Sequence, residues 1–394
     1  MDFTGFGWTV FWIFAIGAAL FAYAWTRSSR RRTSQAPKLY MEALRALVDG
    51  DDHTAFERLK MTANEDSSNI DAYLKLGDLL RKRGKFDRAI RVHEELTLRL
   101  GLSKSAQIAV HKALAQDYLA AANHQLAESS LLKILELDKE HLWAATQLVS
   151  LYESTGRFDE AYEARKTALK ISGQKDGQSL ALYKTLAGTK LAAQGKKHEA
   201  RVEYKEALSH DPNCIPALLY LGDAYWEDGR ADEAVEWWTR LASAHTDAAH
   251  LVFGRLERAY FELGQYGEIT KFYDRILEKN PNNTAALIGL ADLARKKGEY
   301  DRAIQQYRHV MEIDSDNVAA RAGIISALAR MNRWPQVANE VEHLLDAAAF
   351  SETDYICSKC GNREHEATWY CAKCKGVGTF RLWSTSSQSA TTKV

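Results

Sequence analysis

The sequence predicts an all-α protein: a superhelix of stacked helix pairs, with a transmembrane helix at its N-terminus and a small cysteine-rich domain at its C-terminus. Three observations predict this. An uncharged run covers Phe3–Trp25, similar phrases recur about every 34 residues through the middle of the chain, and two Cys-x-x-Cys pairs lie near the end. The balance of 52 basic against 52 acidic side chains gives no bulk electrostatic case for nucleic acid as a partner.

Residues 1–26 are expected to form a single transmembrane anchor. The 23 residues of Phe3–Trp25 carry no charge and, at about 1.5 Å each, would span the roughly 30 Å hydrocarbon core of a bilayer. Arginines directly behind such a helix stay on the cytoplasmic side, and four follow here: Arg27, Arg30, Arg31 and Arg32. The alternative is a cleaved signal peptide, because Ala22-Tyr23-Ala24 fits a cleavage site. No positive charge precedes the run, however, which favours an anchor with a cytoplasmic body.

Residues 27–38 are polar and basic, and we expect them to form a juxtamembrane linker. They lie on anionic headgroups or form a solvated spacer, and the sequence leaves both interpretations open.

Residues 39–348 are expected to hold about eight or nine helix pairs. Phrases such as Gly84-Lys-Phe-Asp-Arg-Ala-Ile90 and Gly298-Glu-Tyr-Asp-Arg-Ala-Ile304 recur around turn positions. The intervals between turns are 34, 38, 34, 39, 34, 35, 34 and 34, and the turn positions are Gly50, Gly84, Ala122, Gly156, Gly195, Gly229, Gly264, Gly298 and Asn332. Small and apolar residues at fixed offsets place an apolar stripe on each of two short helices. This pattern resembles the tetratricopeptide repeat family, whose helix pairs stack into a superhelix with a concave surface.

The two long intervals predict insertions near Leu100–Ser105 and Ser172–Gln178. The first helix of each pair is expected to face the concave groove, where its side chains can bind a peptide or protein surface. The residues predicted to line this groove are Asp78, Arg81, Lys82, Asp223, Trp226, Arg258, Phe261, Asp292 and Arg295. The alternative for Asp78–Arg81 and Asp292–Arg295 is a pair of ordinary helix-surface ion pairs.

No motif in the sequence argues for catalysis. There is no Ser-x-x-Lys, Gly-x-Ser-x-Gly, phosphate loop or His-Glu-x-x-His, and the histidines are scattered. The single Cys214 is expected to be a small packing residue. We therefore expect a binding protein and not an enzyme.

Residues 353–383 change in character, with glycines, aromatic residues and four cysteines: Cys357, Cys360, Cys371 and Cys374. A Cys-x-x-Cys turn can aim both sulfurs at one ion, and two such knuckles complete a tetrahedral four-sulfur cage. A cytoplasmic body disfavours disulfides. A unit of about thirty residues is too small to fold on its apolar core alone, so a metal would stabilise it.

We therefore expect a zinc-ribbon or rubredoxin-like domain that holds one zinc or iron ion through four thiolates, with its aromatic residues packed around the cage and against the last repeat. His365 as a substitute ligand and an electron-transfer iron site stay as alternatives. The Ser/Thr-rich residues 384–394 are expected to be disordered.

The whole layout resembles the lipopolysaccharide assembly protein B family of Gram-negative bacteria. The stretches that carry the resemblance are Leu76–His93, Gln116–Ala121 and the two knuckles. The second knuckle, Cys371-Ala-Lys-Cys374, departs from the family's usual pattern, which has a proline after the first cysteine.

The resemblance implies a single-pass protein of the bacterial inner membrane, with a periplasmic N-terminus. It would act as an adaptor that brings the deacetylase of the lipid A pathway to a membrane-bound ATP-dependent protease, and so regulates lipopolysaccharide biosynthesis. Lipopolysaccharide transport proteins, regulatory membrane proteins and a second copy of the chain are further partners to consider. The alternatives are a scaffold for another membrane or envelope complex, and a metal- or redox-responsive binding protein.

Overall fold

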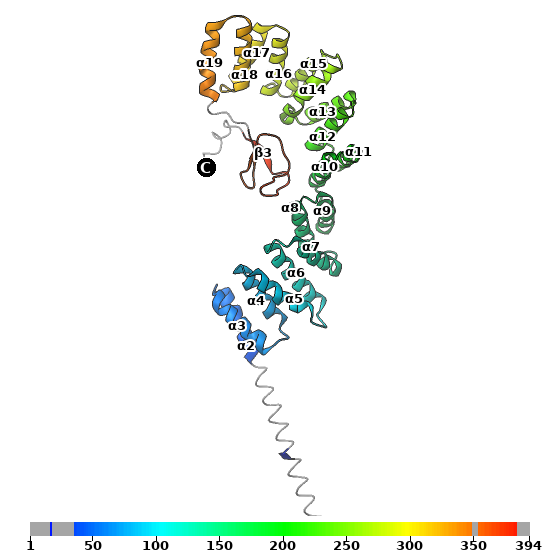
Figure 1. The fold of residues 1–394 in the computed structure, drawn as a ribbon, viewed down its shortest axis with the longest axis vertical. Helices are drawn as coiled ribbons and strands as arrows, with labels where there is room; N and C mark the ends of the chain where they lie inside the picture. The colour runs from blue at the N-terminus through cyan, green and yellow to red at the C-terminus, as the bar shows by residue number, and fades with distance from the viewer. Residues whose placement is uncertain (1–15, 18–34, 349–353, 384–394) are drawn as a thin grey trace, which may run out of the picture. The chain divides into compact units, whose positions relative to one another are not determined.

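The computed structural model describes residues 16–17, 35–348 and 354–383, which form an array of helix pairs followed by a small β-sheet (Figure 1). The chain divides into two compact units, Met1–Leu151 and Tyr152–Val394. The predicted anchor, apart from Ile16 and Gly17, and the predicted tail lie outside the described residues. Among the residues that are described, no helix is both long enough and apolar enough to cross a bilayer.

The first unit is built of antiparallel helices joined by tight turns. Asparagine side chains begin two of these helices: Asn69 Oδ1 accepts from the amide of Ala72, and Asn123 Oδ1 from that of Leu126. The helices are α2 (Gln35–Val48), α3 (Asp52–Glu65), α4 (Ile70–Lys82), α5 (Phe86–Thr97), α6 (Lys104–Ala120), α7 (His124–Leu137) and α8 (Leu142–Thr155), of which the last four residues belong to the second unit.

A buried polar network joins three helices of the first unit. The carboxylate of Asp117 is fully buried, and its two oxygens accept from His93 Nδ1 at 2.5 Å and Arg81 Nη1 at 2.8 Å. The other ring nitrogen of His93 lies 3.1 Å from the carbonyl oxygen of Leu74, which can only accept. Both ring nitrogens of His93 therefore face acceptors, and the buried carboxylate is held between His93 and the cationic Arg81.

The second unit continues the same antiparallel pattern. Its remaining helices are α9 (Phe158–Ser172), α10 (Gly177–Ala193), α11 (Lys197–His210), α12 (Ile215–Glu227), α13 (Ala231–Ala244), the 3-10 turn η1 (Thr246–Ala248), α14 (His250–Glu262), α15 (Glu268–Lys279), α16 (Thr284–Lys296), α17 (Tyr300–Ile313), α18 (Val318–Arg330) and α19 (Trp334–Ala348). Gly222 lets two of them approach closely, because an added Cβ would lie 2.4 Å from Trp238 Nε1. Trp238 is itself 1% exposed and anchors the core of the unit.

The predicted turn positions are confirmed by the backbone. All nine have positive φ, including the two that are not glycine, Ala122 at 55° and Asn332 at 59°. A left-handed residue between two helices reverses the chain within a few residues. The 34-residue spacing of these positions therefore sets the repeat of the array.

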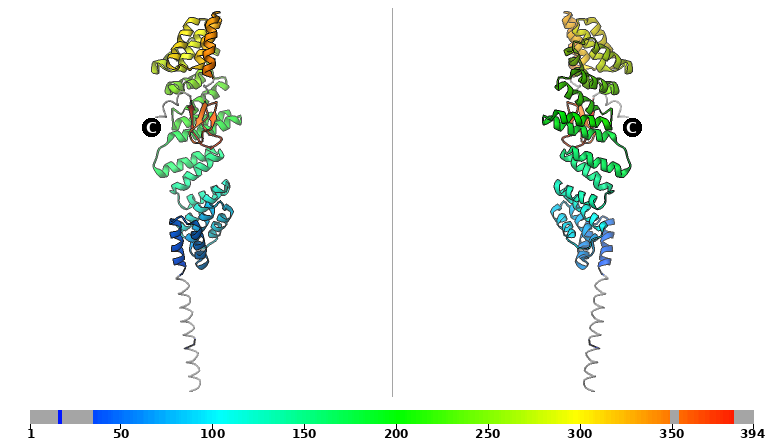
Figure 2. Two further views of the ribbon diagram at one scale, coloured as in Figure 1. Left: turned by 90° about the vertical axis from the view of Figure 1, so that its left-hand side faces the viewer. Right: turned by 90° about the vertical axis from the view of Figure 1, so that its right-hand side faces the viewer.

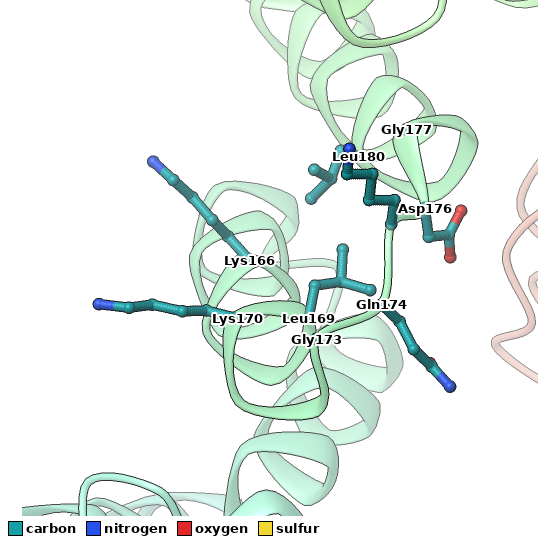
Figure 3. A pocket seen from close by; sticks show the side chains of 9 residues that line it. Lys166, Leu169, Lys170, Gly173, Gln174, Asp176, Gly177 and Leu180 are labelled. Atoms are coloured by element: carbon teal, nitrogen blue, oxygen red, sulfur yellow. The ribbon is translucent and has the colours of Figure 1, made fainter.

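A longer loop lies at the first predicted insertion, residues 98–103 between α5 and α6. At the second, the loop of residues 173–176 between α9 and α10 is no longer than those before α4 and α12, and the additional residues extend α10 to 17 residues. Beside the second loop is a cavity of about 390 Å³. Figure 3 shows Leu169 and Leu180 directed into this space from the two helices, whereas Lys166 and Lys170 extend away from it.

The C-terminal described segment is a three-stranded antiparallel sheet of order β2-β1-β3. The strands are β1 (Asp354–Cys357), β2 (Arg363–Glu364) and β3 (Phe380–Trp383). In β1, Tyr355 pairs with Glu364 on one side, and Cys357 pairs with Phe380 on the other. The sheet therefore places the first cysteine at the end of its central strand, next to the chain that follows the second knuckle.

Candidate metal centre

Two knuckles of matching backbone geometry present the four cysteines. In the first, the amide of Cys357 donates to the carbonyl of Asn362, and the amide of Gly361 donates to the carbonyl of Cys357. The second repeats this pattern: Cys371 N–H bonds the carbonyl of Gly376, and Lys375 N–H bonds the carbonyl of Cys371. The residue after the second cysteine of each pair is left-handed, with φ of 69° at Gly361 and 59° at Lys375. Each turn therefore directs two sulfurs to the same side.

The four sulfurs form one cluster. The Sγ atoms of Cys357 and Cys374 are 3.5 Å apart, those of Cys360 and Cys371 are 3.6 Å apart, and all four lie within 4.8 Å of one another. Four thiolates bound to zinc at about 2.3 Å would be separated by about 3.8 Å, so the cluster has the size of a tetrahedral site. His365, the alternative ligand, is not part of this group. The donor set suits a single zinc or iron ion.

The electrostatics of the four thiols suit a bound cation. Burial opposes ionisation of Cys357, but hydrogen bonds from the Thr379 hydroxyl, 3.1 Å away, and from neighbouring amides outweigh it and lower the pKa of Cys357 to about 6. Burial and the neighbouring thiols raise the pKa of Cys374 to about 12. The first thiolate forms readily, whereas the fourth would be added beside existing negative charge. A bound divalent cation removes this conflict by stabilising all four thiolates.

The module packs on the middle of the array, not on the last repeat as the sequence predicted. Its described contacts are with α8, α9, α10, α12 and α14 of the second unit, and Figure 1 shows the sheet beside α8–α12. The two side views of Figure 2 agree on this face, with the strands in front of the green helices in one view and behind them in the other. The prediction failed because a string of aromatic residues in a sequence does not specify which repeat receives them.

Aromatic side chains of the second knuckle make the principal contacts. Tyr370 donates its hydroxyl to the carbonyl of Glu153 at 3.2 Å, and its ring meets Phe158 edge to face with centroids 5.4 Å apart. Trp369 meets Tyr220 in the same way at 5.6 Å. Such edge-to-face pairs are favourable because the positive edge of one ring faces the negative face of the other.

Two further contacts bring the sheet side of the module against the repeats. The Tyr355 hydroxyl lies 3.3 Å from His250 Nε2 at the start of α14. Gly378 lies so close to α10 that an added Cβ would be 3.0 Å from Leu182 Cδ2. The sequence predicted that aromatic residues of the module pack on a repeat, as Tyr355, Trp369 and Tyr370 do, but it identified neither Gly378 nor the helices that receive the rings. The signal for docking that the sequence offered is the small size of the module, which cannot bury its own aromatic rings.

The structure places the predicted groove residues of the second unit in three different environments. Asp223, Trp226 and Arg258 line a cavity of about 540 Å³ that His250 borders. Arg258 and Phe261 line a second cavity of about 560 Å³, which shares Gly254 and Arg258 with the first. Asp292 and Arg295 lie instead in a network with the Tyr307 hydroxyl, which donates to Asp292 at 2.7 Å.

The charges in these cavities differ in their availability. Asp223 accepts from Arg255 through both carboxylate oxygens, at 2.6 and 2.9 Å. Arg258 is exposed and forms no ion pair with any described part of the chain. Phe261 is 68% exposed and stacks edge to face with Tyr266, which is 60% exposed. This region therefore presents an unpaired cation beside exposed aromatic surface.

The predicted groove residues of the first unit are engaged within the protein. Arg81 bridges Asp78 at 2.6 Å and the buried Asp117 at 2.8 Å, so its guanidinium belongs to the polar network. Lys82 pairs with Asp52 at 2.7 Å. The Asp78–Arg81 pair is a helix-surface ion pair, as the alternative interpretation predicted. That interpretation did not predict the additional bond from Arg81 to the buried Asp117.

Comparisons with known proteins agree with this architecture. Tetratricopeptide repeat family models match residues 191–252, 260–308 and 72–105. Lipopolysaccharide assembly protein B of Escherichia coli K12 is 24% identical over 382 residues, which cover 95% of this chain and 96% of that protein. The chain is a full-length homologue of lipopolysaccharide assembly protein B.

The Haemophilus influenzae protein of the same name is also 24% identical, over 79% of this chain and 78% of its own. The crystal structure of a tetratricopeptide repeat protein from Parabacteroides merdae covers 74% of this chain and 98% of its own, at 14% identity and a TM-score of 0.34. The match to the Escherichia coli protein extends across both units of this chain.

Proposed function

We propose that this protein is an inner-membrane-anchored cytoplasmic adaptor that regulates lipopolysaccharide biosynthesis. In this role it presents the deacetylase of the lipid A pathway to a membrane-bound ATP-dependent protease. The observation that carries the proposal is the full-length homology to lipopolysaccharide assembly protein B, across both the repeats and the metal module. An anchored binding surface raises the effective concentration of membrane-bound partners, which suits an adaptor.

The two connected cavities around Arg258 are the proposed partner-binding region. Exposed aromatic rings and arginine are the side chains most often found at the energetic centre of protein interfaces. Phe261 and Tyr266 supply such rings, and Arg258 supplies the unpaired cation. The remaining predicted groove residues have partners within the protein, so we expect them to contribute less to binding.

We propose a structural role for the metal ion. Cys357, Cys360, Cys371 and Cys374 would hold it, and the ion would keep the two knuckles folded so that Trp369 and Tyr370 stay against the repeats. Closed four-cysteine sites stabilise small domains in this way. A purely structural role favours zinc, and under this proposal the module catalyses no reaction.

The test of function has two arms. Depletion of the protein should raise the cellular level of the deacetylase, and an unchanged level would rule out the proteolytic adaptor. In the second arm, the tagged full chain is purified from detergent-solubilised membranes, where the deacetylase and the protease should co-purify with it. Recovery of a different envelope complex in their place would support the scaffold alternative.

Variants make the second arm specific to the proposed region. Phe261→Ala and Arg258→Glu should reduce recovery of the partners. Trp334→Ala is the matched control, because Trp334 is an aromatic residue of similar exposure, 60%, and begins α19. Equal loss of partners in all three variants would argue against a binding site at the Arg258 cavities.

A further inference from the structure

The loop between α5 and α6 exposes two leucines that the repeat fold does not require. Leu98 is 80% exposed and Leu100 is 99% exposed, in a loop that lengthens one interval of the repeat from 34 to 38 residues. Gly101 has a φ of 77° and turns the chain directly after Leu100. The inserted residues therefore add an apolar tip to the protein and not a core contact.

Hydrogen bonds pin this loop on both sides. Arg99 Nη1 donates to the carbonyl of Ser67 at 2.5 Å, and its guanidinium lies over the ring of Tyr73, 4.3 Å from the centroid. On the other side, Gln107 Nε2 donates to the carbonyl of Leu102 at 3.0 Å. With the neighbouring backbone and Arg99 held, Leu98 and Leu100 are presented to the surroundings instead of folding back.

The loop lies at the edge of the first unit where α2 begins. Successive helices are antiparallel, so the loops before α2, α4 and α6 share one edge and the tight turns share the other. The Arg99–Ser67 bond joins two loops of the first edge, and Tyr40, early in α2, bonds Asp71 at the start of α4. At the opposite edge, Lys82 pairs with Asp52.

Only a short segment of the sequence separates the predicted anchor from this edge. Between Trp25 and Gln35, where α2 begins, there are about ten residue steps, which reach at most about 35 Å when fully extended. The edge that carries Leu98 and Leu100 is therefore the one tethered to the bilayer. Two leucines at a tip can enter the boundary between headgroups and acyl chains without any matching pocket.

We propose that Leu98 and Leu100 insert into the membrane interface as a second, peripheral contact that orients the repeat array on the bilayer. This inference rests on the anchor in the proposed function. The occupant is lipid, because the chain upstream leads to the membrane and the leucines form a tip, not a groove.

The test is site-specific photocrosslinking of the full-length protein in nanodiscs of phosphatidylcholine and phosphatidylglycerol. The photoreactive p-benzoylphenylalanine replaces Leu100 in one variant and Val48 in the other. Val48 is the matched control: it is 87% exposed and lies at the end of α2, on the opposite edge of the same unit. Both positions are exposed, so neither substitution disturbs a packed core.

After illumination of the position-100 variant, mass spectrometry should find lipid adducts on the peptide that contains position 100. The position-48 variant should give no lipid adduct on the corresponding peptide. Equal adducts at both positions, no lipid adduct at position 100, or crosslinks from position 100 to a second protein chain would each overturn the proposal. Failure of the protein to enter nanodiscs would contradict the anchor itself. The two failures are therefore distinguishable.

Discussion

Removal of the metal should unfold the cysteine module and release it from the repeats. Two free energies decide the outcome: that of docking and that of metal binding. The described docking contacts are two edge-to-face ring pairs, at about 0.5–1.5 kcal/mol each, and two hydrogen bonds, at about 0.5–1.5 kcal/mol each. Together these four contacts supply about 2–6 kcal/mol, apart from the apolar area that the interface buries and before the cost of ordering the module is subtracted. Structural zinc contributes about 10–16 kcal/mol to small domains. Docking alone therefore cannot replace the ion.

Hydrogen exchange followed by mass spectrometry measures this effect on the full chain. Removal of the ion by a chelator, or Cys371→Ser, should abolish amide protection in residues 354–383 and lower it near Glu153, Leu182 and Tyr220, which the module contacts. Helices α17 and α18 serve as an internal reference, because no described residue of the module contacts them through a hydrogen bond or ring pair.

The control variant is Cys214→Ser, which removes the one cysteine outside the cluster. Cys214 is buried at the start of α12, and its sulfur lies 3.8 Å from the Thr185 hydroxyl. The Cys214→Ser substitution should leave the amide protection of residues 354–383 unchanged. Full protection of the module after the ion has been removed would refute the reasoning, since it would mean that docking outweighs the metal.

Three further predictions concern single contacts. Asp117→Asn should lower the free energy of unfolding in urea by about 3–5 kcal/mol, because Arg81 loses its buried counter-charge and His93 loses its carboxylate acceptor. Substitution of the exposed pair partner, Asp78→Asn, should cost less than about 1 kcal/mol. Lys375→Gly should strengthen metal retention against a chelator by about 1 kcal/mol, since it relieves a left-handed φ, whereas Gly361→Ala should weaken it. Burial raises the pKa of Asp176, but hydrogen bonds from the Ser179 amide and from Arg165 outweigh burial, so the pKa of Asp176 is lowered in the folded protein. The ionised carboxylate therefore stabilises the folded state above the ordinary pKa of aspartate, and this stabilisation is lost as pH falls through the lower folded pKa. The stability difference between wild type and Asp176→Asn should therefore shrink between pH 7 and pH 3.

The repeats were predictable because each repeat specifies itself locally. A left-handed turn residue, a small residue where helices meet and apolar positions at helical spacing are all visible in the sequence. The positive φ of Ala122 and Asn332 shows that the period identifies turn positions even where glycine is absent. The four-cysteine cluster was predictable for the same reason, since each knuckle is a local turn.

Contacts between distant parts of the chain were not predictable. The pairing of Tyr370 with Glu153 spans 217 residues, and nothing near either residue indicates the other. The network of Asp117, His93 and Arg81 was also missed, because buried and exposed charges on a helix look alike in a sequence. Its Arg81 was expected to face a partner and instead bonds a buried carboxylate.

The position of the module restricts where a partner can bind on the second unit. Its contacts run from Glu153 to His250 and cover part of the surface of the second unit. His250 also borders the first of the two cavities around Arg258, so the module lies beside the proposed partner-binding region. A partner seated at Arg258 and Phe261 would then lie next to the module and could contact both. The metal ion would affect partner binding through this boundary, by holding Tyr355 at the rim of the cavity, without touching the partner.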